Sequence, residues 1–311
     1  MGLTVRQTVA LSLAPWRFGE LVQRPLDAWQ EQVCQAVLIG EWDGMVNPPT
    51  TDAREAGLPR FNALLRCGRQ VGKSETAAQI ASVLCLVPEC VEKAHVTVVL
   101  CSPSQRQSGE IHRRVVSTLE QVDAQFAEKN RMSLALSNGS RFIALPGSES
   151  TVRGISSVDL LILDEAAYVD DRIFTAIRPM IAVAGGVMMM LSSPAGAEGF
   201  FHAVDTSLEP GWARWHIPST VCPRISDGFL LKERELMGEA LFRREYLAEY
   251  VSELGGLFTE EEVQQMLQPI GAPVVAPSMR QLLSGPAHER NPSVRQVARG
   301  FRMPDEIRRT G

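Results

Sequence analysis

One stretch sets the architecture of the chain: Leu64-Leu65-Arg66-Cys67-Gly68-Arg69-Gln70-Val71-Gly72-Lys73-Ser74. A short apolar run enters a turn that contains two glycines, and the turn delivers Lys73 and Ser74 to the start of a helical pattern. This is the order of parts in the P-loop pattern G-x-x-x-x-G-K-[ST], although Cys67 stands where the pattern has its first glycine. A match this short leaves open whether the stretch is a nucleotide site, so the surrounding sequence has to decide.

The chemistry that a P-loop offers is phosphate binding. Its backbone N–H groups surround phosphate oxygens at the N-terminus of a helix, where the helix dipole favours negative charge. In this arrangement Lys73 reaches the β and γ phosphates and the hydroxyl of Ser74 ligates Mg²⁺. The predicted ligands are therefore ATP and Mg²⁺, and the residues expected to line the phosphates are Gly68, Arg69, Gln70, Val71, Gly72, Lys73 and Ser74.

Strands and helices alternate around this stretch. Apolar and β-branched runs predict strands at 61–67, 95–101, 158–165 and 186–191, and helical spacing predicts helices at 74–86 and from Gln105 to Phe126. Asn138-Gly139, between two alternating runs, predicts a β-hairpin. The pattern predicts an α/β fold of the P-loop NTPase (RecA-like) class, with a mostly parallel sheet flanked by helices.

Polar residues follow two of the predicted buried strands. Ligands of such sheets bind at the carboxyl ends of the strands, where the P-loop also lies. Asp164 is expected to hold Mg²⁺, and Glu165 to orient or deprotonate the attacking water; the alternative is a strand end that meets solvent. Ser192 and Ser193 either hydrogen-bond the γ-phosphate or the water, or cap the strand before Pro194.

Three further side chains are candidates for the site. Charge on the transferred γ-phosphoryl group calls for a mobile cation, for which Arg69 and Arg153 are available, although an arginine in a loop is often simply exposed. The amide of Gln30 offers the donor and acceptor that suit the adenine edge. The alternative for Gln30, a solvated helical glutamine, is common.

Composition narrows the possible classes. The 311 residues carry a net charge of −5 with 45% hydrophobic and 22% charged residues, which is typical of a globular protein and gives no overall attraction to nucleic acid. The six cysteines show no C-x-x-C spacing, so we expect core residues in a reducing compartment. No apolar run is long enough to span a bilayer, which favours a cytoplasmic protein without membrane contact.

The sequence divides into three predicted parts. Residues 1–200 form the ATPase core and include a helix that begins near Asp27. Residues 201–258 form a small lid or linker subdomain, with an edge strand at Trp212–Ile217 and a charged helix from Leu230 to Tyr250. Residues 259–311 are rich in Pro and Arg and are expected to be largely disordered.

Three motifs together resemble a known family. Gly68–Ser74, the segment Leu160–Ala167 and the segment Met190–Pro194 are similar, in this order, to the Walker A, Walker B and coupling motifs of the ATPase domain of phage terminase large subunits. The resemblance runs from Trp29-Gln30 to about Phe258. It implies an ATP-hydrolysing motor that drives double-stranded DNA into procapsids in the bacterial host cytoplasm, as a homo-oligomeric ring on the portal protein with a terminase small subunit.

The resemblance also implies residue roles. Gln30 would read adenine, Arg69 would sense the γ-phosphate, and Glu165 would be the catalytic carboxylate. Arg153, in a Thr-x-Arg-Gly loop, would be an arginine finger that acts on a neighbouring subunit. The coupling of hydrolysis to DNA movement would fall to Ser192 and Ser193.

The family's metal-dependent nuclease domain has no counterpart in the sequence pattern after Phe258, so nuclease activity is not expected. Two alternatives to the motor stay open at this point. A helicase-like ATPase would need a second RecA-like domain, for which the residues after Pro194 offer too few alternating strands and helices. An inactive remnant would bind nucleotide or partner subunits without turnover.

Overall fold

A computed structural model describes residues 2–41, 60–146, 154–207, 209 and 211–251 of the protein. These residues lie in one compact unit, Met1–Thr259. In chain order the longer elements are α1 (Val5–Leu13), α2 (Phe18–Leu21), α3 (Ala28–Leu38), β1 (Asn62–Cys67), α4 (Lys73–Leu86), β2 (Thr97–Ser102), α5 (Gln105–Gln121), β3 (Phe126–Lys129), β4 (Ser133–Leu136), β5 (Arg141–Pro146), β6 (Leu160–Asp164), α7 (Asp171–Ile177), β7 (Val187–Ser192), α8 (Gly199–Thr206), β8 (Trp212–Ile217), α9 (Asp227–Met237) and α10 (Glu239–Glu245).

Short 3₁₀ helices connect several of these elements. They are η1 (Pro15–Arg17), η2 (Pro88–Val91), η3 (Ala166–Tyr168), η4 (Arg178–Ile181) and η5 (Ser219–Val221).

All eight strands of the described residues form one sheet, in the order β3-β4-β5-β2-β6-β7-β1-β8. Neighbours from β5 to β8 run parallel, and β3, β4 and β5 form an antiparallel meander at one edge. The strand that leads into the phosphate loop, β1, therefore lies between β7 and β8. The predicted α/β class with a mostly parallel sheet is confirmed.

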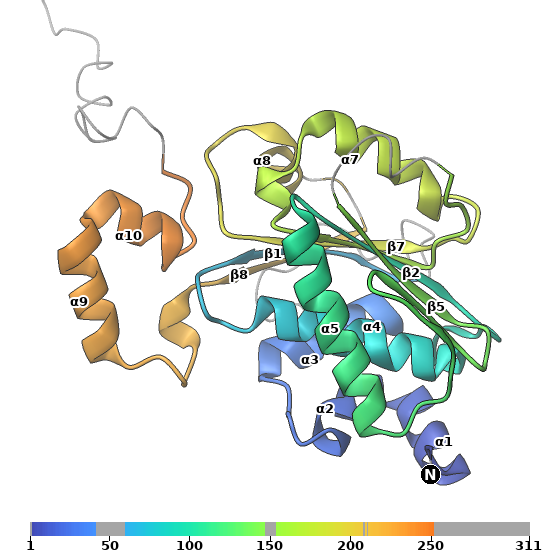
Figure 1. Ribbon diagram of the computed structural model, residues 1–311. Helices are drawn as coiled ribbons and strands as arrows, with labels where there is room; N and C mark the ends of the chain where they lie inside the picture. The colour runs from blue at the N-terminus through green and yellow to red at the C-terminus, as the bar shows by residue number, and fades with distance from the viewer. Residues whose placement is uncertain (1, 42–59, 147–153, 208, 210, 252–311) are drawn as a thin grey trace, which may run out of the picture. The chain divides into compact units, whose positions relative to one another are not determined.

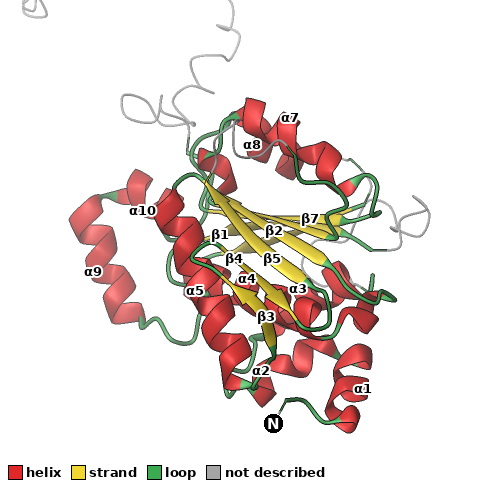
Figure 2. Ribbon diagram, turned by 45° about the vertical axis from the view of Figure 1, so that its right-hand side comes forward, coloured by secondary structure: helices red, strands yellow, loops and turns green. Residues whose placement is uncertain are grey.

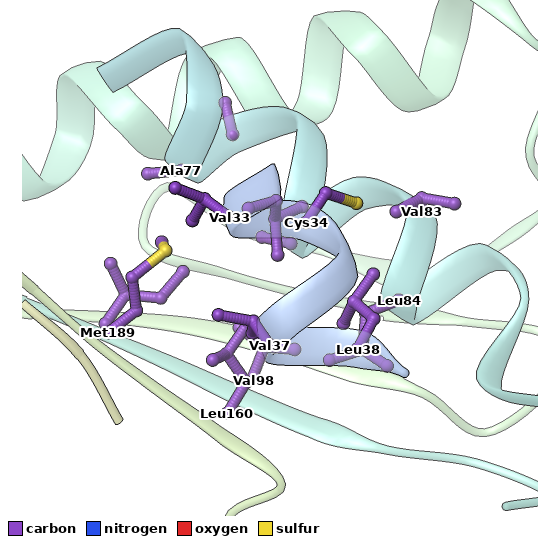
Figure 3. Close-up of a cluster of buried hydrophobic side chains, with 14 of the residues drawn as sticks. Val33, Cys34, Val37, Leu38, Ala77, Val83, Leu84, Val98, Leu160 and Met189 are labelled. Carbon is purple, nitrogen blue, oxygen red and sulfur yellow. The ribbon is translucent and has the colours of Figure 1, made fainter. Parts of the chain in front are cut away.

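Helices cover both faces of the sheet (Figure 1 and Figure 2). The α3, α4 and α5 helices lie on one face, and α7 and α8 lie on the other. The α3 helix packs inward because Val33, Val37 and Leu38 recur at helical spacing and are at most 1% exposed. They meet apolar side chains of α4 and of the sheet, among them Leu84 and Met189 (Figure 3). Burial of each such side chain contributes about 1.5–3 kcal/mol.

The predicted hairpin is present, with Asn138-Gly139 between β4 and β5. The predicted extent of the preceding helix is wrong, since α5 ends at Gln121 and Phe126 belongs to β3. Asp123, with φ of 53°, turns the chain out of the helix between them.

The lid helix expected at 230–250 is two helices, which is a second correction. Gly238 separates α9 from α10 and has φ of 79°. A left-handed residue of this kind cannot continue an α-helix and is most easily supplied by glycine. The two helices pack on each other through Leu230, Phe242 and Tyr246.

The predicted division at residues 200 and 258 stays a prediction. Within 201–258, β8 joins the central sheet beside β1 and is parallel to it, whereas α9 and α10 have a small apolar cluster of their own. The tail expected from residue 259 lies outside the described residues. No helix in the described part of the chain is long and apolar enough to cross a membrane.

Candidate active site

The phosphate loop connects β1 to α4, and its first glycine is Gly68, the residue after Cys67. Cys67 is the last residue of β1 and is fully buried, and burial raises the pKa of its thiol to about 12. At Gly68 a Cβ would come within 2.4 Å of both Ser219 Oγ and the carbonyl oxygen of Tyr246. Position 68 therefore requires glycine, whereas Cys67 lies in the strand and not in the loop.

The backbone of the loop leaves its donors free. Gln70 and Gly72 have φ of 64° and 104°, in the left-handed region, and conformations of this kind gather successive N–H groups into a concave anion site. The N–H groups of Gly68 and Arg69 donate to the carbonyls of Ile217 and Glu245. Within the described residues, the next five N–H groups, those of residues 70–74, donate to no protein group. An unpaired run at a helix N-terminus favours a phosphate group.

Lys73 and Glu165 meet at the centre of the site. The Nζ of Lys73 lies 2.6 Å from Glu165 Oε1, and both side chains are largely buried. Burial alone would lower the pKa of Lys73, but the Glu165 carboxylate outweighs it and raises this pKa. Lys73 is therefore a fixed positive charge. Glu165 has φ of 51°, an uncommon conformation for a residue other than glycine, and such strain is often found at functional sites.

Asp164 precedes Glu165 at the end of β6 and is only 5% exposed. Burial, followed by the charge of Glu165, raises its pKa to about 7, and its Oδ1 is buried without a hydrogen-bond partner. An unpartnered buried carboxylate oxygen is an available ligand for a cation. Asp164 and the hydroxyl of Ser74, the second residue of α4, would supply oxygen ligands of the kind that a hydrated Mg²⁺ prefers. No group of three or more His, Cys, Asp or Glu side chains in the described residues could hold a metal unaided.

The serines at the end of β7 also lie in this site. Ser192 Oγ donates to Glu165 Oε2 at 3.3 Å and lies 2.7 Å from the carbonyl oxygen of Ser193. Both serines are buried. In the sheet Ser192 pairs with Arg66, the residue before Cys67, so β7 touches both the strand that carries the loop and the carboxylate.

Arg69 forms an ion pair with α10. Its Nε lies 2.6 Å from Oε2 of Glu245, a buried residue at the end of α10, while the Arg69 side chain is 60% exposed. The side chain of Arg69 is thereby tied to α10. Arg153, the other candidate arginine, lies outside the described residues.

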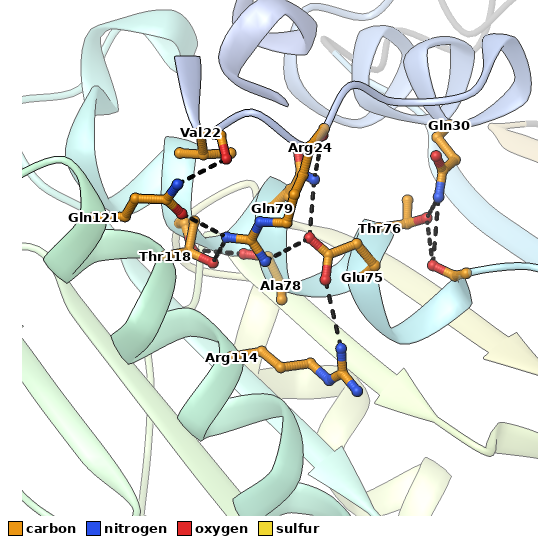
Figure 4. Close-up of polar contacts among 12 residues, drawn as sticks. Val22, Arg24, Gln30, Glu75, Thr76, Ala78, Gln79, Arg114, Thr118 and Gln121 are labelled. Carbon is orange, nitrogen blue, oxygen red and sulfur yellow. Dashed lines mark hydrogen bonds and ion pairs between the residues drawn. The ribbon is translucent and has the colours of Figure 1, made fainter. Parts of the chain in front are cut away.

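Gln30 lies beside the loop and is 4% exposed. Its amide oxygen accepts from the N–H of Asp27, forming a capping box at the start of α3. Its amide nitrogen donates to Thr76 Oγ1 at 2.7 Å and to the carbonyl of Gly72 at 3.4 Å (Figure 4). Both halves of the amide are thus engaged within the chain, and adenine recognition by Gln30 stays a prediction.

Other residues at the site have no local sequence signal. Glu245 holds Arg69 from 176 positions away, and Ser219, Cys222 and Arg224 contact the outer side of the loop. A cavity of about 460 Å³ borders the first turn of α3, with Trp29, His216 and Val221 in its lining. Contacts between segments this far apart depend on the completed fold.

A strand that ends in a glycine turn with free N–H groups, a lysine and a serine at the following helix, and an acidic pair on a nearby strand define the P-loop NTPase class. The family model for the terminase large subunit, T4likevirus-type, N-terminal, matches residues 64–221, half of the chain. The chain belongs to this family.

Solved structures agree with the fold. The Thermus phage P74-26 large terminase ATPase domain is 22% identical, with a TM-score of 0.53 over 63% of this chain and 92% of that chain. The HK97 bacteriophage large terminase is 18% identical, with a TM-score of 0.57 over 80% and 56%. A large terminase from a thermophilic bacteriophage, in complex with ADP, is 12% identical, with a TM-score of 0.54 over 73% and 54%.

The chain thus matches about half the length of the HK97 terminase and of the ADP-bound terminase. No curated protein matches its sequence.

Proposed function

We propose that this chain is the Mg²⁺-dependent ATP-hydrolysing module of a phage terminase large subunit, and that it couples hydrolysis to the movement of double-stranded DNA into procapsids. The observation that carries the proposal is the 2.6 Å contact between Lys73 and Glu165 beside a loop with free N–H groups. A phosphate-binding cation and a carboxylate able to act on water lie together there, which is the arrangement that phosphoryl transfer to water requires.

Each residue has a role in this proposal. The free N–H groups of residues 70–74 bind phosphate oxygens, and Lys73 exchanges Glu165 for the β and γ phosphates. Glu165, released from Lys73 but still near Ser192, orients the attacking water and accepts its proton. Ser74 and Asp164 would hold Mg²⁺, which neutralises developing charge on the phosphates when bound. The nucleobase is placed in the cavity that Trp29 lines, since an aromatic ring offers a stacking surface.

The motor role extends the proposal to partners. Family membership supports a DNA-packaging motor, and we infer that double-stranded DNA is the substrate that is moved. A portal protein, a terminase small subunit and a ring of identical subunits in the host cytoplasm complete the proposed assembly, with Arg153 as the finger between subunits. DNA cleavage is not part of the proposed function.

An ATPase assay with three additions tests the proposal. Phosphate release by the purified chain with Mg²⁺ and ATP is measured alone, with linear double-stranded DNA, and with single-stranded DNA. Stimulation by the duplex supports the motor. Stimulation by the single strand alone would indicate a helicase-like ATPase instead, and binding of ATP without turnover would indicate an inactive remnant.

A further inference from the structure

The outer side of the phosphate loop is bound by one short segment, residues 219–224, between β8 and α9. Ser219 Oγ donates to the carbonyl of Arg69 at 2.7 Å, and Cys222 Sγ lies 3.9 Å from the carbonyl of Gln70. Arg224 Nη2 donates to the carbonyl of Val71 at 3.2 Å. Three successive loop carbonyls are thus each held by a side chain from the same segment.

This pattern complements the free donors on the inner side. A peptide unit carries its N–H and its C=O in opposite directions, so fixing the carbonyls outward aims the N–H groups that follow them inward. The N–H groups joined to these carbonyls belong to Gln70, Val71 and Gly72, which donate to no protein group within the described residues. A hydrogen bond to a carbonyl also polarises its peptide unit and strengthens the N–H as a donor.

We propose that Ser219, Cys222 and Arg224 are positioning residues for phosphate binding, and that residues 219–224, the backing segment, set the direction of the loop N–H groups. The inference rests on the proposed function, in which these N–H groups bind the phosphates of ATP. None of the three side chains is assigned contact with the nucleotide. They act through the carbonyls of the loop.

The backing segment is itself fixed at both ends. The N–H of Ser219 donates to the carbonyl of Tyr246 at 2.7 Å, and Ser219 is fully buried against Gly68. Arg224 forms two hydrogen bonds to the carboxylate of Asp27, at 3.0 and 2.8 Å. Asp27 also caps α3, whose Gln30 donates to Thr76 and weakly to Gly72 O. Four successive carbonyls, from Arg69 to Gly72, are therefore each within contact distance of a side-chain donor.

Two substitutions separate positioning from support of the fold. Ser219→Ala removes the hydroxyl that donates to the carbonyl of Arg69, and Arg224→Met removes the guanidinium that donates to the carbonyl of Val71. The side chain of Arg224 is 54% exposed, and an ion pair at such a position contributes little to stability. The matched control is Ser226→Ala, because the side chain of Ser226 caps α9 by accepting from the N–H of Phe229. Arg224→Lys keeps a charge and a donor and serves as the conservative variant.

The experiment measures equilibrium binding of ADP, ATPγS and pyrophosphate to the intact chain with Mg²⁺, together with thermal unfolding and steady-state ATP hydrolysis. Pyrophosphate is included because it has no base or sugar. The loss of one hydrogen bond corresponds to a change of about three- to tenfold in affinity. We expect Ser219→Ala and Arg224→Met to lower the affinity for all three ligands by this factor. Both variants should raise the KM for ATP more than they lower kcat, and Arg224→Lys should recover part of the affinity. Ser226→Ala should lower thermal stability alone.

The inference is overturned if both variants bind the three ligands like wild type, even where their melting temperatures fall, because the contacts would then be structural only. The proposed function itself would be contradicted by a different result, namely that the wild-type chain binds none of the three ligands. If Ser219→Ala does not fold, Arg224→Met and Arg224→Lys still decide the matter, since Arg224 is half exposed.

Discussion

Lys73 and Glu165 lie 2.6 Å apart, so the cation expected to bind phosphate and the carboxylate expected to act on water hold each other. Nucleotide phosphates must therefore compete with Glu165 for Lys73. The exchange would release the carboxylate toward the water only when phosphate is present. Ser192, within 3.3 Å of Glu165, keeps a second contact on the carboxylate while Lys73 changes partner.

Lys73→Ala is expected to weaken ATP binding by about 10- to 100-fold, because a charge-assisted hydrogen bond contributes about 1.5–3 kcal/mol. The rate of ATP hydrolysis should fall as well. Binding of ATPγS measures the affinity, and phosphate release measures the rate of hydrolysis. The same substitution at Lys232, an exposed residue of α9, is the control and should change neither. If Lys73→Ala binds ATPγS with the affinity of wild type, Lys73 does not bind the phosphates.

Asp164→Asn is expected to stabilise the protein at pH 8, in the absence of nucleotide and divalent cations, while it lowers turnover at least about 100-fold. The folded-state pKa of Asp164 is about 7, above its ordinary value of about 3.9 in an unfolded chain. At pH 8 the ionised carboxylate therefore destabilises the folded state, and asparagine removes that effect. The gain should be roughly 1–4 kcal/mol at pH 8 and should largely vanish near pH 4.

Denaturant unfolding at the two pH values measures this gain. A variant that is less stable than wild type at pH 8 would contradict the account of Asp164.

Arg69→Ala tests whether Arg69, which Glu245 holds in this structure, moves to the γ-phosphate when nucleotide binds; its effect on stability should be small. Its partner Glu245 keeps a contact with Arg244 at 3.1 Å, and an ion pair at a side chain that is 60% exposed contributes at most about 1 kcal/mol. If Arg69 acts on the γ-phosphate, turnover should fall at least about 100-fold. The exposed pair of Arg234 and Glu239 supplies the control, since Arg234→Ala removes a similar contact from the lid helices. Equal turnover in the two variants would count against Arg69.

His112 supplies a pH dependence that is independent of the site. It is 3% exposed on α5, against the ring of Phe142, and burial lowers its pKa although a hydrogen bond to Ser133 opposes the shift. Below pH about 6.5 the unfolded chain binds a proton there that the folded chain does not, so stability falls as the pH falls. In His112→Leu this loss is absent. The stability advantage of wild type over the variant, measured by denaturant unfolding, should therefore shrink between pH 7 and pH 5.

The sequence was sufficient for elements whose signals are local. The hairpin at Asn138-Gly139 and the buried strand before Asp164 follow from turn chemistry and apolar runs alone. Phe126 lies in β3 although it continues the helical spacing of α5 by coincidence, and Gly238 ends α9 although helix-forming residues flank it on both sides. Local periodicity cannot show where a chain turns when tertiary packing decides it.

Long-range contacts account for what the sequence could not predict at the site. No sequence pattern near Arg69 predicts its contact with Glu245. Likewise, no pattern near residues 219–224 predicts that their side chains donate to carbonyls of the phosphate loop. Gln30 illustrates the same limit: its amide suits an adenine edge, but the fold engages it with Asp27 and Thr76. The residue type indicates which interactions a side chain can make, and the completed fold determines which group it contacts.

The most direct test of the central claim compares wild type with Glu165→Gln for ATP binding and for phosphate release under the same conditions. Glutamine keeps the shape of the side chain but neither attracts Lys73 as a charge nor accepts a proton from water. We expect affinity for ATP to be retained or increased, because Lys73 no longer has to leave a carboxylate, and phosphate release to fall at least about 100-fold. Hydrolysis at the wild-type rate in Glu165→Gln would contradict the account.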